Sequence, residues 1–112
     1  MQKRYLIDMV VSQIEGQTHG VAESHGCYLL ETQDSAKTYG VGEQRFDVVR
    51  RSDTVPIALV GLTQEEHGTH LLVTDEPHSE RQGEGFDHDA FSGFADLLLE
   101  SLSSEWKVEV IE

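Results

Sequence analysis

A stretch in the middle of the sequence, Thr54–Asp75, constrains the fold more than any other, because its pattern predicts a β-hairpin. Two apolar segments, Ile57–Leu62 and His70–Val73, flank the polar connector Thr63–Thr69. The charged residues of this connector and its late Gly68 are typical of a hairpin loop of about five residues. The segment Ile57–Leu62 is apolar at both parities. We therefore expect it to form a strand that is buried on both faces, in the middle of a sheet.

Three segments before this hairpin have apolar patterns that predict strands, namely Lys3–Ile14, Cys27–Thr32 and Arg45–Arg51. In the first of them some apolar residues are four apart, which also fits a helix, but its β-branched residues favour a strand. Glu15–Gly26 contains three glycines and only two apolar residues, which predicts a loop or a weak edge hairpin. Gln33–Gln44 is also expected to be a loop.

The sequence predicts one helix, from about Asp87 to Leu102. Its apolar residues recur at three- and four-residue spacing in one stripe, formed by Phe91, Phe94, Ala95, Leu98 and Leu102. Asp87 can cap its N-terminus. An exposed polar loop, Glu76–Phe86, is expected before it, and a final strand, Glu105–Ile111, after it.

This layout predicts an α+β fold in a single domain, residues 1–112. The expected architecture is a mostly antiparallel, twisted sheet of five or six strands, with one C-terminal helix packed on one face and followed by a last strand. One helix covers only one face of the doubly buried strand. The second cover comes either from the sheet curling on itself or from a partner chain, so a homodimer packed through the open sheet face is one of the expected arrangements.

The charge of the chain limits its partners. Twenty-one Asp and Glu stand against eight Lys and Arg, which gives a formal net charge of −13. Such a chain is repelled by nucleic acid and by anionic membranes, so neither is expected as a direct partner. Three explanations of the acidity stay open: a surface adapted to high salt, a basic protein partner, or mimicry of the DNA phosphate backbone. The acids are scattered rather than gathered in one run, which argues against mimicry.

The sequence also predicts a soluble, cytoplasmic protein. No apolar run approaches the roughly 20 residues that span a bilayer. Asp8 interrupts the apolar stretch near the N-terminus and no small-residue cleavage site follows, which argues against a signal peptide. Cys27 is the single cysteine and cannot form an internal disulfide, which fits a reducing compartment.

Four residues are candidate ligands of a divalent metal: His25, Cys27, His67 and His70. His25 and Cys27 are two apart, so their side chains would share one face of a strand. His67 and His70 lie in or beside the hairpin connector. Imidazole and thiolate groups are suitable ligands for zinc and other first-row metals, but the spacings match no established ligand set. The alternative is that the histidines are surface residues and that Cys27 is a small buried residue.

No pattern in the sequence indicates catalysis. It contains no phosphate-binding loop, no nucleophile elbow and no H-E-x-x-H zinc motif. The function expected first is therefore that of a small acidic binding protein without a cofactor, which acts on another protein through its acidic surface or its open sheet face. Glu65, Glu66 and His67 at the hairpin tip are the expected contact residues. Two alternatives are a metal- or ligand-binding domain and a DNA-mimic inhibitor of a nucleic-acid-binding protein.

Overall fold

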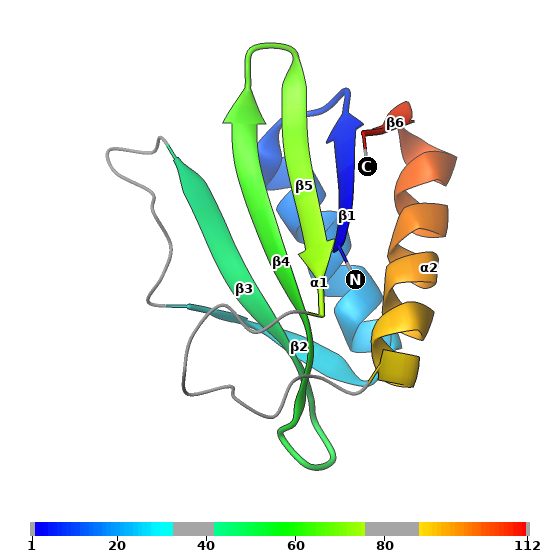
Figure 1. Ribbon diagram of the computed structural model, residues 1–112. Coiled ribbons are helices and arrows are strands. Elements are labelled where there is room, and N and C mark those ends of the chain that lie inside the picture. Colours follow the sequence, from blue (N-terminus) through cyan, green and yellow to red (C-terminus); the bar gives the residue numbers. More distant parts are fainter. Residues whose placement is uncertain (1, 33–41, 76–87, 112) are drawn as a thin grey trace.

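The chain folds into an antiparallel sheet with helices packed against it, as a computed structural model shows (Figure 1). The structure describes residues 2–32, 42–75 and 88–111, and within these residues six strands form one sheet that packs with two helices. The expected α+β class and antiparallel sheet are confirmed. The elements in chain order are β1 (Gln2–Ile7), α1 (Val11–Ser24), β2 (Cys27–Glu31), β3 (Glu43–Arg50), β4 (Pro56–Glu65), β5 (Gly68–Thr74), α2 (His88–Glu105) and β6 (Val108–Val110).

The predicted hairpin lies in the middle of this sheet. The strand order is β2-β3-β4-β5-β1-β6, and every neighbouring pair is antiparallel. β4 and β5 pair in register as far as Glu65 and Gly68, so the turn consists of Glu66 and His67 alone. The loop is shorter than the expected five residues, because the polar ends of the connector continue the strand ladder. A strand end that projects into solvent needs no apolar side chains.

The central strand β4 is buried on both faces, as expected. Every residue of Ile57–Leu62 is buried, and Leu59, which points away from the helices, is only 1% exposed. On that side the carboxylate of Glu43 lies over Gly61. A Cβ atom added to Gly61 would lie 2.7 Å from Oε2 of Glu43, which is closer than two such atoms can approach. Glycine at this position therefore makes room for a polar side chain to cover the middle of the sheet.

The structure corrects the interpretation of the segment between β1 and β2. The expected strand Lys3–Ile14 ends at Ile7, and the expected loop Glu15–Gly26 is mostly helix, because α1 runs over Val11–Ser24. The chain thus has a second helix that the sequence pattern did not predict.

Helix α1 has weak local signals and depends on packing. Gly16 and Gly20 each lower helix propensity by about 1 kcal/mol relative to alanine. The N-cap residue, Val10, has no side-chain group that caps the helix. Its buried residues, Ile14, Thr18, Val21 and Ala22, recur at helical spacing, and the Thr18 hydroxyl donates a hydrogen bond of 2.7 Å to the Ile14 carbonyl. Helices of this kind form mainly because one face is buried in tertiary contacts.

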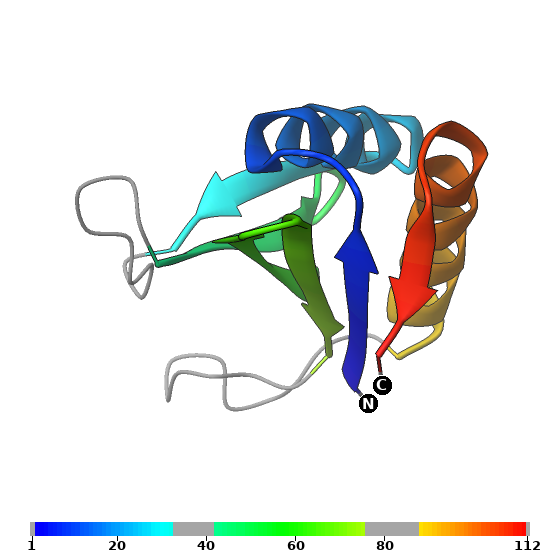
Figure 2. The ribbon, with the colours of Figure 1, turned by 90° about the horizontal axis from the view of Figure 1, so that it is seen from above.

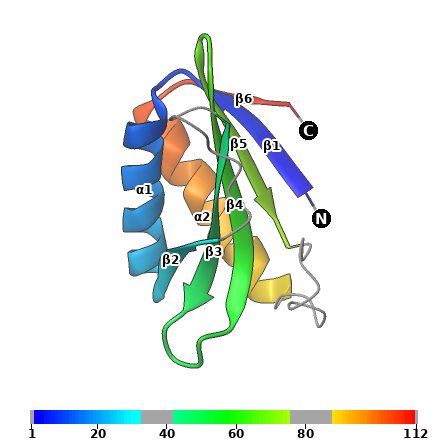
Figure 3. The same cartoon turned by 90° about the vertical axis from the view of Figure 1, so that its left-hand side faces the viewer.

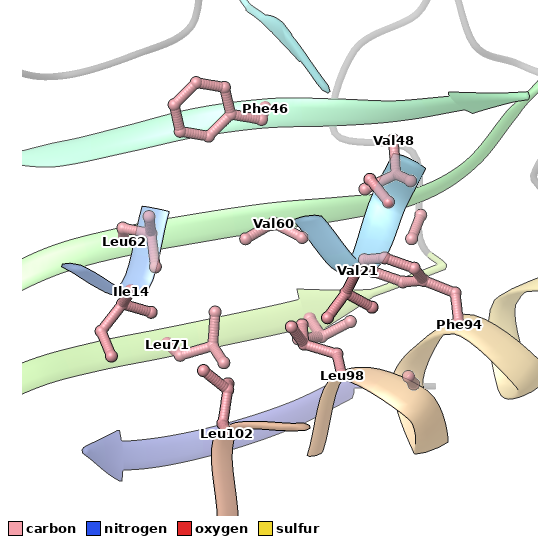
Figure 4. Packing of buried hydrophobic residues seen from close by; sticks show 14 of the residues in the cluster. Ile14, Val21, Phe46, Val48, Val60, Leu62, Leu71, Phe94, Leu98 and Leu102 are labelled. Atoms are coloured by element: carbon pink, nitrogen blue, oxygen red, sulfur yellow. The ribbon is translucent and has the colours of Figure 1, made fainter. Parts of the chain in front are cut away.

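The predicted C-terminal helix and last strand are confirmed. α2 buries the predicted apolar stripe, of which Phe94, Leu98 and Leu102 point toward the sheet in Figure 4. Both helices pack on the same face of the sheet, and they contact each other (Figures 2 and 3). Their apolar residues and those of the strands form one hydrophobic cluster. The other face of the sheet, which we call the open face, carries no helix of the described residues.

We predict that Gly16→Ala and Gly20→Ala each stabilise the protein by about 0.5–1 kcal/mol, because alanine has the higher helix propensity. An added Cβ atom meets nothing within 4 Å at either position, so no steric cost opposes the gain. Urea unfolding of the two variants and of the unsubstituted protein measures the change. Unchanged or lower stability in both variants would contradict the assignment of this segment to a helix.

Candidate functional site

The hairpin tip, where function was expected, lies at one end of the sheet. β5 pairs there with the end of β1, and β6 begins on the other side of β1 (Figure 1). Glu65, Glu66 and His67 are all exposed at this tip. The expected contact residues are thus accessible and close to one another along the turn.

Hydrogen bonds fix the tip to the junction between β1 and α1. The Gln64 side-chain amide donates to the carbonyls of Glu65, at 2.9 Å, and Gly68, at 2.8 Å. Its oxygen accepts a hydrogen bond of 3.1 Å from the Val11 N–H, at the first residue of α1. The Thr69 hydroxyl donates to the Met9 carbonyl at 2.6 Å. One side chain therefore closes the turn and also satisfies a helix N–H that has no partner within the helix.

Close backbone contact at Gly68 adds to this attachment. Gly68 is buried and has a φ of +146°, a conformation that residues with side chains rarely adopt. A Cβ atom here would lie 2.2 Å from the Ile7 carbonyl oxygen. Only glycine allows the start of β5 to lie this close to the end of β1, so the position of the tip depends on this residue.

A shallow depression lies beside the tip on the open face. It consists of two adjoining hollows of about 330 and 220 Å³, which share Leu6 and His67. Leu6 pairs with His70 on one side and with Glu109 on the other, so its side chain lies between theirs on the same face. The remaining lining residues are Glu65, Glu66, His70 and Ile111 in the larger hollow, and Asp8, Lys107 and Glu109 in the smaller one. We call these two hollows together the hairpin-tip hollow.

The lining of the hairpin-tip hollow combines an apolar floor with an acidic rim. Leu6 and the half-exposed Ile111 supply apolar surface. Four carboxylates, those of Asp8, Glu65, Glu66 and Glu109, surround it, against the single ammonium group of Lys107. Such a lining suits a ligand with an apolar part and a positive charge, since a cation is attracted by the rim and a methylene chain by the floor.

The structure separates the four candidate metal ligands into two pairs at opposite ends of the sheet. His67 and His70 belong to the hairpin tip, whereas His25 and Cys27 follow the far end of α1. Among residues 2–32, 42–75 and 88–111, no three His, Cys, Asp or Glu side chains are grouped so that they could hold a metal ion. The four residues therefore do not form one site.

Cys27 has the environment of a buried core residue. Its side chain is fully buried in the hydrophobic cluster, and its thiol lies 3.6 Å from the His25 carbonyl oxygen. Burial raises the pKa of the Cys27 thiol, against the lowering effect of the nearby Arg50 and Arg51. The His25 ring lies against Phe94 of α2, with 6.3 Å between the ring centroids. The H-x-C pair thus packs the end of α1 against α2 and β2.

Sequence reasoning found the acidic tip but not the apolar residues beside it. Leu6 and Ile111 each stand at the parity of their strand that faces away from the helices. An apolar residue at this parity is the feature of the sequence that could have indicated apolar surface on the open face. It does not show that the two residues meet, because only the pairing of β1 with β6 brings them together.

The described residues show further hollows elsewhere. One of about 230 Å³ lies between the helices and is lined by small residues such as Gly16 and Gly20. Another of about 320 Å³ lies at the start of α1, beside Val10 and Gln64. Neither combines apolar surface with several charges as the hairpin-tip hollow does.

Comparison with known proteins identifies no family. No family model matches this sequence, and no curated protein is significantly similar to it. Neither helix in the described part of the chain has both the length and the apolar character needed to cross a membrane.

We predict that Gly68→Ala destabilises the protein by more than about 3 kcal/mol, because the added Cβ atom cannot fit beside the Ile7 carbonyl and the backbone conformation is also unfavourable. Gly26→Ala is the matched control. Gly26 also has a positive φ, of 76°, but open space surrounds it, so this variant should lose only about 1–2 kcal/mol. Chemical unfolding measures the free energy of unfolding of both variants. Equal losses of stability in the two variants would show that the tip is not held by close contact at Gly68.

Proposed function

We propose that this protein is a binding module without catalytic activity, and that it docks a basic segment of a partner protein in the hairpin-tip hollow. A lysine or arginine of the partner would lay its methylene chain on Leu6 and direct its charge to the surrounding carboxylates. The observation that carries the proposal is the combination of an apolar floor and an acidic rim beside a firmly held turn. A site on rigid elements loses little conformational entropy when it binds.

The distribution of charge supports a cationic partner. The two helices contain six acids, Glu15, Glu23, Asp89, Asp96, Glu100 and Glu105, and no lysine or arginine. Every lysine and arginine of the described residues lies on a strand or beside one. With a net charge of −13, the molecule attracts basic proteins over long distances and thereby raises their rate of association. The hairpin-tip hollow would then provide the specific contact.

A nuclear magnetic resonance titration with a defined probe tests the proposal. The probe is the blocked tetrapeptide Leu-Lys-Leu-Arg, compared with Leu-Glu-Leu-Glu and with Ser-Lys-Ser-Arg. We expect the first peptide to shift the amide signals of Leu6, His67 and His70. The acidic peptide should not bind, because the rim repels it. The peptide with serine should bind more weakly, because it lacks apolar contact with the floor.

Two double variants show whether the hairpin tip or the overall charge of the protein is responsible for binding the probe peptide. Glu65→Gln with Glu66→Gln removes two rim charges, whereas Asp96→Asn with Glu100→Gln removes two exposed charges from α2. We expect the first pair of substitutions to lower the affinity for the probe peptide roughly fivefold, at about 0.5 kcal/mol per exposed ion pair. The second pair should have a much smaller effect on this affinity. Equal effects, or probe-induced shifts confined to α1 and α2, would contradict the proposed site. The second result would favour the alternative of an acidic surface that imitates DNA.

A further inference from the structure

Strand β6 is an edge of the sheet. It pairs with β1 on one side, and no strand of the described residues pairs with its other side (Figures 1 and 2). Edge strands of monomeric proteins are commonly protected by charges, prolines or bulges, because their unpaired backbone groups can pair with another chain. At β6, in contrast, Val110 is 64% exposed and the following Ile111 is 52% exposed.

The backbone of β6 directs its unpaired groups outward at two residues. The Lys107 carbonyl accepts a hydrogen bond from the Asp8 N–H, and the Ile111 N–H donates to the Arg4 carbonyl. The odd-numbered residues of this strand therefore direct their backbone groups toward β1. Since successive residues alternate, the N–H and C=O groups of Val108 and Val110 point away from the sheet.

We propose that β6 pairs antiparallel with β6 of a second copy of this chain, with Val108 opposite Val108 of that copy. The two Val108 residues then form a hydrogen-bonded pair across a two-fold axis. In this register Lys107 lies opposite Glu109 of the second copy, and Glu109 lies opposite its Lys107. Neither residue forms an ion pair with another described residue, so both are available for this contact.

Charge selects this register among those that the backbone allows. Outward-pointing residues must face each other, and three such registers are centred within β6, on Val108, Glu109 or Val110. Centring on Glu109 places two carboxylates directly opposite each other, which is unfavourable. Centring on Val110 places Glu109 opposite Ile111, so Glu109 has no basic residue directly across the pair. Only the register centred on Val108 makes two favourable charge pairs.

The pairing would also bring the hairpin-tip hollows of the two copies close together. An axis perpendicular to the sheet keeps the open faces of both copies on the same side, so two hairpin-tip hollows would lie next to each other. The dimer itself does not depend on what these hollows bind. It also differs from a dimer packed through the open sheet face, which was one of the arrangements expected from the sequence.

Variants that reverse one charge of each proposed pair test the register, and sedimentation equilibrium measures how strongly each variant dimerises. We expect a reversible dimer, and we expect Lys107→Glu and Glu109→Lys each to weaken it roughly tenfold, because two attractive pairs become repulsive. Mixing the two variants should restore association, since each charge then faces its opposite in the mixed dimer. Glu100→Lys on α2 is the matched control for Glu109→Lys and should not weaken the dimer. Both changes reduce the net negative charge, so general repulsion between copies cannot explain a loss with Glu109→Lys alone.

Three results would overturn the proposal. The first is an unsubstituted protein that stays monomeric up to millimolar concentration at moderate salt, where long-range repulsion is screened. The second is a dimer that neither single variant weakens. The third is a pair of weakened variants that do not associate when mixed, which would place the contact elsewhere or in another register.

Discussion

The rest of the structure depends on the burial of β4 on both faces. A strand that is apolar at both parities must lie inside a sheet, with cover on each side. α1 and α2 cover one face together, while on the other the Glu43 side chain lies over Gly61. Because both helices lie on one face, the ends of β1, β5 and β6 have no helix of the described residues over their other face. The position of the candidate site therefore follows from how the central strand is covered.

The candidate site joins this architecture to the charge of the molecule. The helices carry acids and no lysine or arginine, and the hairpin tip adds three more acidic or imidazole side chains beside apolar Leu6. Gln64, Gly68 and Thr69 hold the tip against β1 and α1. A fixed turn beside an apolar floor can select among the many cations that a negative molecule attracts. We propose that overall charge brings basic partners close and that the local shape provides specificity.

Strong periodicity made part of the fold predictable. The hairpin and α2 were predicted because their apolar residues repeat with periods of two and 3.6 residues. Helix α1 was missed because Gly16 and Gly20 weaken its propensity and because one of its buried residues, Thr18, is polar. Tertiary packing, which the local sequence does not show, determines whether such a helix forms. The acidic tip was predicted, but the hollow was not, since Leu6 meets Ile111 only through pairing between strands distant in the sequence.

We propose that a basic, partly apolar ligand binds beside the hairpin tip and not on the helices. Intermolecular nuclear Overhauser effects between the bound Leu-Lys-Leu-Arg peptide and the methyl groups of the protein test it most directly. We predict contacts from the lysine and arginine methylenes to the methyl groups of Leu6 and Ile111. Contacts to Val21 and Leu97, which line the hollow between the two helices, with none to Leu6, would contradict it.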